Sequence, residues 1–490
     1  MKHDDRTRIG LSKGSPPKGA LSRRTLLRSV LTLTAAGFAS RLGFPELARA
    51  AAQASSTRRF VFCYFPGGWD QLLFLDPRDT EANQKRFDDE NRSTNLTETR
   101  YGTLDGYNGF SSRLVTAGNL VFGPATEKVN SSAPKITKYY QKIAIVRGIN
   151  MGTLGHEVGY RYFLTAKFPL GSTARGTSLA TEAAAQMQST VPLPSLSLRV
   201  ETYNEHRPGQ YSSMRVDSLD DLLMVLERGK DMLERDPVED ALSEYAKTGA
   251  PCAVDVYDRR GLLTRMRGSD ATARATLASK LADKFRFTTG NDPASAAIRQ
   301  QYGLNRGEAG SPGARAAFAA QAIKQQVAQC VSVAIGTGTD THFTGNVGHA
   351  DLLYPGITAL AALIDDLAKS PAPPELARLG GDTWLDHTTL LAFSEFSRTP
   401  MFNQFGGRDH HLTSSCLLAG AGIAGNQIAG ASGDVGMGPG RYDFRTRQTI
   451  TNGGENIKPE HVAATLLASA GLDPGGALIR EEPIRALIAG

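Results

Sequence analysis

Acidic and histidine side chains follow several apolar runs of this sequence, close to the point where each run ends. Asp, Glu and His are the side chains that zinc and other divalent metals accept as ligands. Ligands of an open parallel sheet bind beyond the carboxyl ends of its strands, so residues that follow different strands can meet. The sequence therefore predicts a site for one or two ions of zinc, manganese or calcium, formed by Asp70, Asp340, His342, Glu395, Asp409 and His410.

The stretch from Leu390 to His411 carries the strongest part of this signal. An apolar run ends there in Ser394 and Glu395, and a loop rich in Gly, Pro and Arg then returns Asp409 and His410. A second pair of possible ligands is Asp340 and His342. They are two positions apart, so an extended chain would point both side chains to one side. A simpler interpretation of each cluster stays open, namely a helix cap at Asp70 and a polar loop at 340–342.

Two arginines of the same loop, Arg398 and Arg408, are open to two interpretations. A guanidinium can bind two oxygens of a phosphate or sulfate group at once, so both residues are candidates for an anion site. Alternatively, either arginine could pair with Glu395 in a buried ion pair that only supports the fold.

The elements that would position these residues alternate between strands and helices. Apolar runs predict strands, and spacing of apolar residues by three and four predicts helices. This alternation is typical of an α/β protein with a mainly parallel sheet and helices on both faces. Strands are expected at 59–65, 143–146, 196–200, 331–335, 388–394 and 415–418, and helices at 314–328, 349–370 and 458–472.

Residues 51–490 are predicted to form one domain that contains two unusual segments. Residues 76–135 are polar and rich in Asn, Thr, Gly and Ser, which is typical of an insertion on the surface. Residues 217–290 are helical in character, with helices expected at about 218–236 and 270–285, and 287–312 is expected to be a loop.

The first fifty residues have the pattern of an export signal. Ser22-Arg23-Arg24-Thr25-Leu26-Leu27-Arg28 matches a twin-arginine motif, and an apolar stretch and Ala48-Arg49-Ala50 follow it. Such a stretch is too short for a stable transmembrane helix, and a small-residue motif of this kind is a cleavage site. We therefore expect the twin-arginine translocation machinery to export the chain to the periplasm or the medium, with a mature terminus near Ala51. An amphipathic N-terminal helix is the alternative.

Charge and cysteine content exclude two other classes of function. The whole chain has a formal net charge of +6, residues 1–50 contribute ten basic and three acidic residues, or +7, and the remainder therefore carries −1. A domain without a basic excess is not expected to bind nucleic acid. Its four cysteines show no C-x-x-C spacing, which disfavours a zinc finger.

The motifs named above resemble a known protein family. The segments GGWD (67–70), DTH (340–342), SEFSRTP (394–400) and GRDH (407–410) occur in the order found in the domain of unknown function 1501 family. That family is similar to the alkaline phosphatase and sulfatase superfamily. The resemblance covers about Phe60 to Pro474 and implies an alkaline phosphatase-like fold.

The superfamily pattern implies roles for individual residues. Asp70, Asp340, His342 and His410 resemble metal ligands, and Glu395 stands where the superfamily has an Asp ligand. Its members use a Ser, Thr or modified Cys as nucleophile at a helix start, for which Thr153 is the best hydroxyl candidate here. His156 would then be a base, a metal ligand or a phosphate-binding group. Because Phe396 stands where a second ligand is common, a two-metal site could be reduced to one ion.

Two functions of different class follow from these observations. The first is an exported metal-dependent hydrolase of phosphate or sulfate esters, which would act on an anionic small molecule or glycan. The second is a non-catalytic protein of the cell envelope that binds an anionic glycan or a partner in the same cleft. A zinc peptidase is less favoured because no H-E-x-x-H motif occurs.

Overall fold

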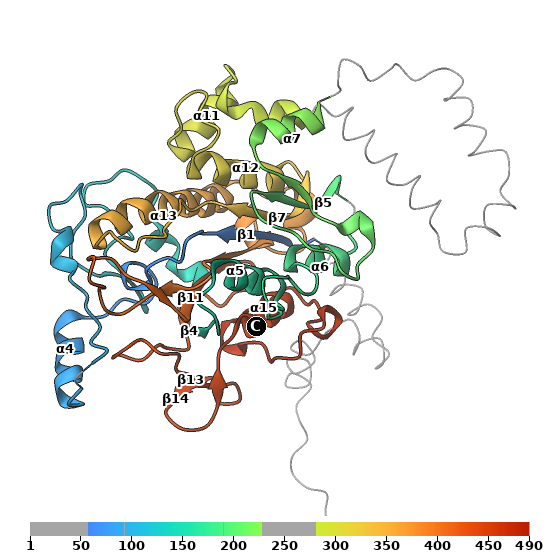
Figure 1. The fold of residues 1–490 in the computed structure, drawn as a ribbon. Helices are drawn as coiled ribbons and strands as arrows, with labels where there is room; N and C mark the ends of the chain where they lie inside the picture. Colours follow the sequence, from blue (N-terminus) through green and yellow to red (C-terminus); the bar gives the residue numbers. More distant parts are fainter. Residues whose placement is uncertain (1–56, 93, 190, 228–280, 490) are drawn as a thin grey trace, which may run out of the picture. The chain divides into compact units, whose positions relative to one another are not determined.

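Eight strands form one mixed sheet at the centre of the protein, with helices packed on both of its faces (Figure 1). The structure is a computed structural model that describes residues 57–92, 94–189, 191–227 and 281–489. The strand order is β12-β4-β11-β8-β1-β7-β5-β6. Their bounds are β1 Arg59–Tyr64, β4 Ile143–Asn150, β5 Leu193–Leu198, β6 Met214–Val216, β7 Ala328–Ala334, β8 Thr388–Phe393, β11 Thr413–Gly420 and β12 Gln427–Ala429.

The sheet is mainly parallel, as the sequence predicts. Strand β11 is the exception among the described strands, because it runs antiparallel to both of its neighbours, β4 and β8. The other pairings in this sheet are parallel. One reversed strand matters for the position of the site, because its start lies at the edge where the parallel strands end.

Strand β1 shows why both faces of the sheet must be covered. All six of its residues are buried. Phe60 and Phe62 pack on the side of α5 (His156–Thr165), α6 (Leu179–Gln186) and α15 (Pro459–Ser469). Val61 and Cys63 pack on the opposite side, with α12 (Pro312–Lys324) and α13 (Asn346–Lys369). Because side chains alternate along a strand, a continuous apolar run serves two cores.

Helix α13 is the one described helix that is long and apolar enough to fit a membrane span by length and composition. Of its most apolar window, 61% is buried inside the protein. Its buried side chains, among them Leu353, Leu360 and Leu363, belong to the core on the α12 side of the sheet. This packing is what a core helix of an α/β protein shows.

Residues 76–135 do not lie only on the surface. They contain α4 (Thr80–Asp89), the 3-10 helix η2 (Tyr101–Leu104) and the hairpin of β2 (Val115–Ala117) and β3 (Leu120–Phe122). Leu104 and Phe122 are fully buried in the same core as α13. The segment is therefore polar on average but anchored by a few large side chains.

The expected loop at 287–312 is wrong, because it contains the helix α11 (Pro293–Tyr302). Asp292 caps the helix by accepting a hydrogen bond from the Ser295 N–H, and Gly303 ends it in a left-handed conformation. Asp at the cap, Pro at the first position and Gly after the end are the usual signals of helix termini. They were present in the sequence, but the helix has too few apolar residues to show a strong stripe.

The helices expected at 218–236 and 270–285 are described only in part. Helix α7 covers Leu219–Leu226 and the 3-10 helix η5 covers Leu281–Thr288, while 228–280 lie outside the described residues. The remaining helices and strands are short. Their bounds are η1 Gln71–Leu73, η3 Ile136–Lys142, η4 Gly209–Tyr211, α14 Pro374–Ala377, η6 Trp384–His387, β9 Ser397–Arg398, β10 His410–His411, β13 Arg441–Asp443, β14 Gln448–Ile450, β15 Glu455–Asn456, η7 Gly475–Ala477 and η8 Arg485–Leu487.

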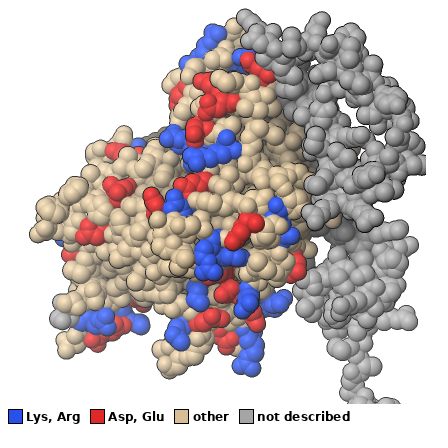
Figure 2. Space-filling model, turned by 45° about the vertical axis from the view of Figure 1, so that its right-hand side comes forward, with Lys and Arg blue, Asp and Glu red and all other residues tan. Residues whose placement is uncertain are grey.

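Charges on the face of the molecule shown in Figure 2 are mixed: Lys and Arg side chains lie among Asp and Glu side chains, without a large area of one sign. The three cysteines in the described part of the chain form no disulfide. Cys63, Cys330 and Cys416 are buried free thiols, whose pKa burial raises. Cys252 lies outside the described residues.

Candidate metal centre

The carboxyl ends of three neighbouring strands deliver the candidate residues to one edge of the sheet. Strand β1 lies between β8 and β7. Asp70, Asp340 and Glu395 follow β1, β7 and β8 in the chain. Because β11 is antiparallel, its beginning reaches the same edge, and His410 lies just before it. The reversed strand thus brings a late histidine to the ends of earlier strands.

Three of these side chains converge closely enough to hold one metal ion. A nitrogen of His156, a carboxylate oxygen of Asp340 and a nitrogen of His410 all lie within 4.8 Å of one another. His342 joins them, because its Nε2 lies 3.0 Å from Nε2 of His410 and 3.1 Å from Oδ1 of Asp340. We call His156, Asp340, His342 and His410 the metal group.

Each imidazole of the metal group is held through its Nδ1 atom. Nδ1 of His156 lies 2.8 Å from Oε1 of Glu395, and Nδ1 of His342 lies 2.7 Å from Oδ1 of Asp409. Nδ1 of His410 lies 2.7 Å from the carbonyl oxygen of Leu154. Carboxylate and carbonyl oxygens only accept, so Nδ1 carries the proton in all three rings.

This assignment leaves three Nε2 lone pairs directed at the Asp340 carboxylate and at one another. Nε2 of His156 is buried, has no hydrogen-bond partner among the described residues, and lies 3.4 Å from Oδ2 of Asp340. The Nε2 atoms of His342 and His410 face each other at 3.0 Å, and in neutral rings protonated at Nδ1 neither of them carries a proton. Lone pairs in such an arrangement repel unless a cation binds them. Histidine ligands whose other nitrogen donates to a carboxylate or carbonyl are typical of zinc sites.

Glu395 is almost fully buried and acts on the metal group through His156. Besides that imidazole, Oε1 accepts a hydrogen bond from the Gly67 N–H at 2.8 Å, and Oε2 lies 2.9 Å from the Ser394 hydroxyl. The hydrogen bond to Glu395 raises the pKa of His156, against the opposing effect of its partial burial. Glu395 therefore orients the His156 ring, and its two oxygens are engaged within the protein.

Gly67 makes this close approach possible. Its φ is +100°, and a Cβ atom there would lie 2.5 Å from the Thr339 nitrogen and 2.6 Å from the Asp340 nitrogen. No other residue type avoids both the left-handed strain and the clash. The turn after β1 is therefore pressed against the segment that carries Asp340.

The charges of the site favour a divalent cation. Burial alone would raise the pKa of Asp340, but the hydrogen bond from Arg398 and the nearby charges lower it to about 2. Burial lowers the pKa of His410, which favours its neutral, ligating form. The carboxylates of Asp340, Glu395 and Asp409 and the guanidinium of Arg398 give a formal charge of 1 − 3 = −2.

Asp70 lies outside the metal group, although the sequence places it among the expected ligands. Its side chain accepts a hydrogen bond from the Leu72 N–H at 2.9 Å and so caps the short helix η1. Its other oxygen lies 3.0 Å from Nε of Arg408, and both residues are buried. Burial raises the pKa of Asp70 even though Arg408 opposes that shift. The Arg408 guanidinium thus occupies the position beside the Asp70 carboxylate where a metal ion would have to bind.

The two arginines are engaged within the protein and do not point into an open anion site. Arg398 is fully buried and donates from Nε to the Gly68 carbonyl at 2.8 Å, and from Nη2 to the Gly67 carbonyl and Asp340. Arg408 donates from Nη1 to the carbonyls of Thr399 and Pro400. Neither arginine pairs with Glu395, so the alternative of a Glu395–arginine ion pair is not what the structure shows.

Thr153, the proposed nucleophile, lies in the loop that precedes α5. Its hydroxyl accepts a hydrogen bond from the Gly155 N–H at 3.0 Å. Leu154, the next residue, provides the carbonyl that holds His410. Thr153 is therefore close in sequence to His156 and next to the residue that holds His410, but the hydrogen bond of its hydroxyl is local.

Three residues support the site in ways that the sequence did not predict. Asn403 donates to the His342 carbonyl at 2.9 Å and to Asp409 at 3.1 Å. His349 accepts from the Asp70 N–H at 2.8 Å, and Ser394 accepts from the Trp69 N–H at 3.1 Å. All three join segments far apart in the chain, and only Asn403, in a Gly-rich loop, had the sequence signal of a turn residue.

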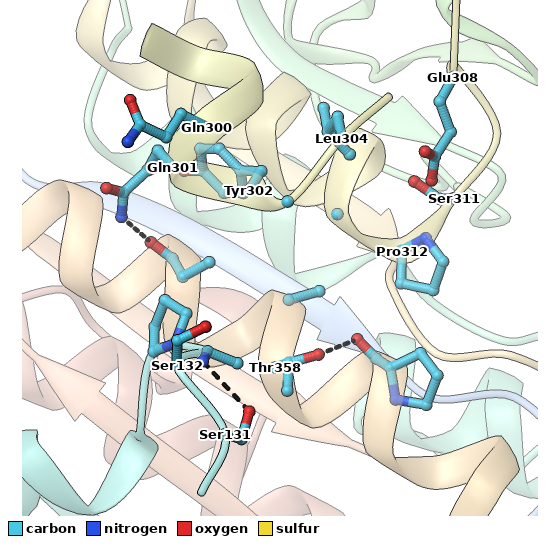
Figure 3. Close-up of a pocket in the computed structure, with 17 residues that line it drawn as sticks. Ser131, Ser132, Gln300, Gln301, Tyr302, Leu304, Glu308, Ser311, Pro312 and Thr358 are labelled. Atoms are coloured by element: carbon cyan, nitrogen blue, oxygen red, sulfur yellow. Dashed lines mark hydrogen bonds between the residues drawn. The ribbon is translucent and has the colours of Figure 1, made fainter. Parts of the chain in front are cut away.

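A separate cavity of about 430 Å³ lies elsewhere in the fold, between α11, α12, α13 and the loop 131–134 (Figure 3). Its lining includes Gln301, Tyr302, Pro312 and Thr358. None of the metal group lines it. The two hydrogen bonds of the Gln301 amide go to the protein itself, to Ala362 and Asp365. The cavity is therefore distinct from the metal group.

Comparison with known proteins agrees with the resemblance of the motifs. None of the curated proteins compared with this chain matches it. The profile of the family described as "Protein of unknown function (DUF1501)" matches residues 57–454, which include the whole metal group and every residue that orients it. This chain is therefore a member of the DUF1501 family.

Proposed function

We propose that this protein is a metal-dependent hydrolase of phosphate or sulfate esters with a fold related to the alkaline phosphatase and sulfatase superfamily. The observation that carries the proposal is the convergence of three Nε2 lone pairs on Asp340, each fixed by a partner at Nδ1. Four nitrogen and oxygen ligands suit zinc in particular. Asp70 pairs with Arg408, so we propose one ion rather than two.

Residues around the metal group fix the orientation of its side chains, which metal-assisted hydrolysis requires. Glu395, Asp409 and the Leu154 carbonyl hold the Nδ1 atoms, so that Nε2 of each ring faces the proposed ion. Arg398 donates a hydrogen bond to the Asp340 carboxylate and is itself held by the carbonyls of Gly67 and Gly68, so it fixes the position of Asp340. A bound divalent ion supplies a Lewis acid and lowers the pKa of water. The Thr153 hydroxyl is the proposed nucleophile, with water as the alternative.

Metal analysis is the first test. Protein purified without chelator should contain about one equivalent of zinc by elemental mass spectrometry, and Asp340→Ala and His410→Ala should lose it. Turnover of aryl phosphates and aryl sulfates by the loaded protein would then assign the reaction. Thr153→Ala should keep the metal and lose turnover if its hydroxyl attacks. Equal, negligible metal in wild type and Asp340→Ala would end the proposal.

A second candidate is a non-catalytic protein of the cell envelope that binds an anionic glycan or a partner through a bound metal ion. The observation that favours it is the engagement of Arg398 and Arg408 within the protein, which leaves neither guanidinium for the transferred group. Metal-loaded protein that binds a sulfated polysaccharide but hydrolyses no ester would support this candidate.

We also propose export by the twin-arginine route, which rests on the motif at 22–28 and the cleavage motif at 48–50. Replacing both Arg23 and Arg24 by Lys should retain the protein in the cytoplasm with its leader uncut. Exported wild type should begin near Ala51 by N-terminal sequencing. Export that is unchanged in the double variant would contradict this route.

A further inference from the structure

Two phenylalanine side chains beside the metal group, Phe343 and Phe405, are exposed to solvent instead of packing in a core. Phe343 is 72% exposed and Phe405 is 60% exposed, the highest values for aromatic side chains among the described residues. Their rings contact each other, with centroids 5.3 Å apart and planes inclined by 60°. Phe343 directly follows the ligand His342, and the two ring centroids are 6.3 Å apart.

The hydrogen bonds that hold the metal group also hold this aromatic pair. Asn403 binds the His342 carbonyl and Asp409 through its amide nitrogen. Its amide oxygen accepts from the N–H groups of Phe405 at 3.0 Å and Gly407 at 3.1 Å. Gly407 also packs against the backbone of His342 so closely that a Cβ atom would not fit. The loop with Phe405 is therefore fastened to a metal ligand.

Two exposed aromatic rings do not help to stabilise the fold as buried rings would, which suggests a role in binding. Each exposed ring gives up most of the stabilisation that burial of a large apolar side chain provides. Contiguous exposed apolar surface on a soluble protein commonly marks a binding site. Two inclined rings offer one face and one edge to a third ring, the geometry that aromatic contacts prefer.

We propose that Phe343 and Phe405 bind the leaving group of the substrate, and that this group carries a ring with a flat apolar face. This inference rests on the proposed function, since it assigns the substrate class of the same site. An aryl group and the C–H face of a pyranose both offer such a surface. The metal group would then hold the anionic end of the ester while the aromatic pair selects the ring.

Binding of stable analogues tests the pair without relying on turnover. Zinc-loaded protein is titrated by calorimetry with methylphosphonate, phenylphosphonate and a glucopyranose bearing a phosphonate at C6. The variants are Phe343→Ala, Phe405→Ala and the double variant, and zinc content and thermal unfolding confirm that each is folded and loaded. Met224→Ala is the matched control, because Met224 is 76% exposed on α7 and lies outside the metal group.

We expect a ring-bearing phosphonate to bind wild type about tenfold more tightly than methylphosphonate, from two aromatic contacts. The double variant should lose this advantage, while Met224→Ala keeps it and methylphosphonate binds all five proteins equally. Which of the two ring probes gains more identifies an aryl or a sugar substrate. Equal binding of all three probes to wild type, or an advantage that persists in the double variant, overturns the inference and leaves the proposed hydrolase intact. Protein that takes up no zinc and binds no phosphonate overturns both.

Discussion

The buried carboxylate of Glu395 lies 2.8 Å from Nδ1 of His156, and this contact decides which nitrogen of the ring faces Asp340. The two residues are 239 positions apart in the chain. The Gly67 N–H and the Ser394 hydroxyl donate hydrogen bonds to the same carboxylate. The orientation of one proposed ligand is therefore set by strands β1 and β8 together, and by neither alone.

Replacing Glu395 by Gln should weaken zinc binding roughly 10- to 100-fold, the usual cost of removing a partner that orients a ligand. The amide has nearly the same shape, so the protein should fold, but it lacks the charge that stabilises the Nδ1 proton against the bound cation. Competition with a chromogenic chelator measures the affinity. Asp351→Asn, which changes a partly exposed carboxylate on α13 that binds Tyr107 and Asn108, is the control. Wild-type affinity in Glu395→Gln would show that the contact is only structural.

Breaking the Asp70–Arg408 pair should affect stability rather than metal content. Arg408→Met leaves a buried carboxylate without its partner, which is expected to cost about 3–5 kcal/mol in the free energy of unfolding. The double variant Asp70→Asn/Arg408→Met should regain part of that loss. Urea unfolding gives the energies, and elemental analysis should find the same zinc in Asp70→Asn as in wild type. Loss of zinc in Asp70→Asn would restore Asp70 as a ligand.

Gly67→Ala should disturb the site because of the clash with the segment of Asp340. The left-handed conformation alone costs about 1–2 kcal/mol for a residue with a Cβ atom. Gly171→Ala is a matched control, since its φ is +60° and nothing lies within 4 Å of the added atom. We expect the control to lose only that amount of stability in urea unfolding and to keep its zinc. Gly67→Ala should lose more stability and most of its zinc affinity; equal effects in the two variants would contradict the packing argument.

Stability of the metal-free protein should depend on pH through His349. This ring is fully buried and accepts from the Asp70 N–H, and burial together with Arg398 and Arg408 lowers its pKa to about 3. The unfolded chain binds the proton near pH 6.5, so between pH 6.5 and 3 unfolding takes up a proton. Stability should therefore fall as the pH drops, by at most about 1.4 kcal/mol per pH unit.

The variant His349→Gln isolates this contribution. Glutamine can still accept from the Asp70 N–H but does not titrate in this range. Urea unfolding at pH 7 and pH 5 should show a smaller difference in stability between the two proteins at pH 5 than at pH 7. A difference that stays constant with pH would mean that His349 does not carry the dependence.

Much of the fold follows from local patterns of the sequence. The apolar runs at 59–65 and 388–394 match β1 and β8 within a residue, because a strand buried on both faces appears in the sequence as a nearly continuous apolar run. The stripe of the helix expected at 349–370 likewise identified α13, apart from its first turn. The helix α11 was missed because only its capping residues, and no apolar stripe, mark it. The direction of β11 could not be predicted, since its residues would suit a strand of either direction.

The sequence by itself determined which chemistry was available: Asp340, His342 and His410 stand after apolar runs with the spacing of ligands, and all three belong to the metal group. Only the tertiary structure decided the partners. It made His156 a member of the metal group and Glu395 its orienting carboxylate, and it paired Asp70 with Arg408 instead of a metal ion. The reason is physical: residue types fix what a side chain can bind, but burial and contacts between segments more than two hundred residues apart fix what it does bind.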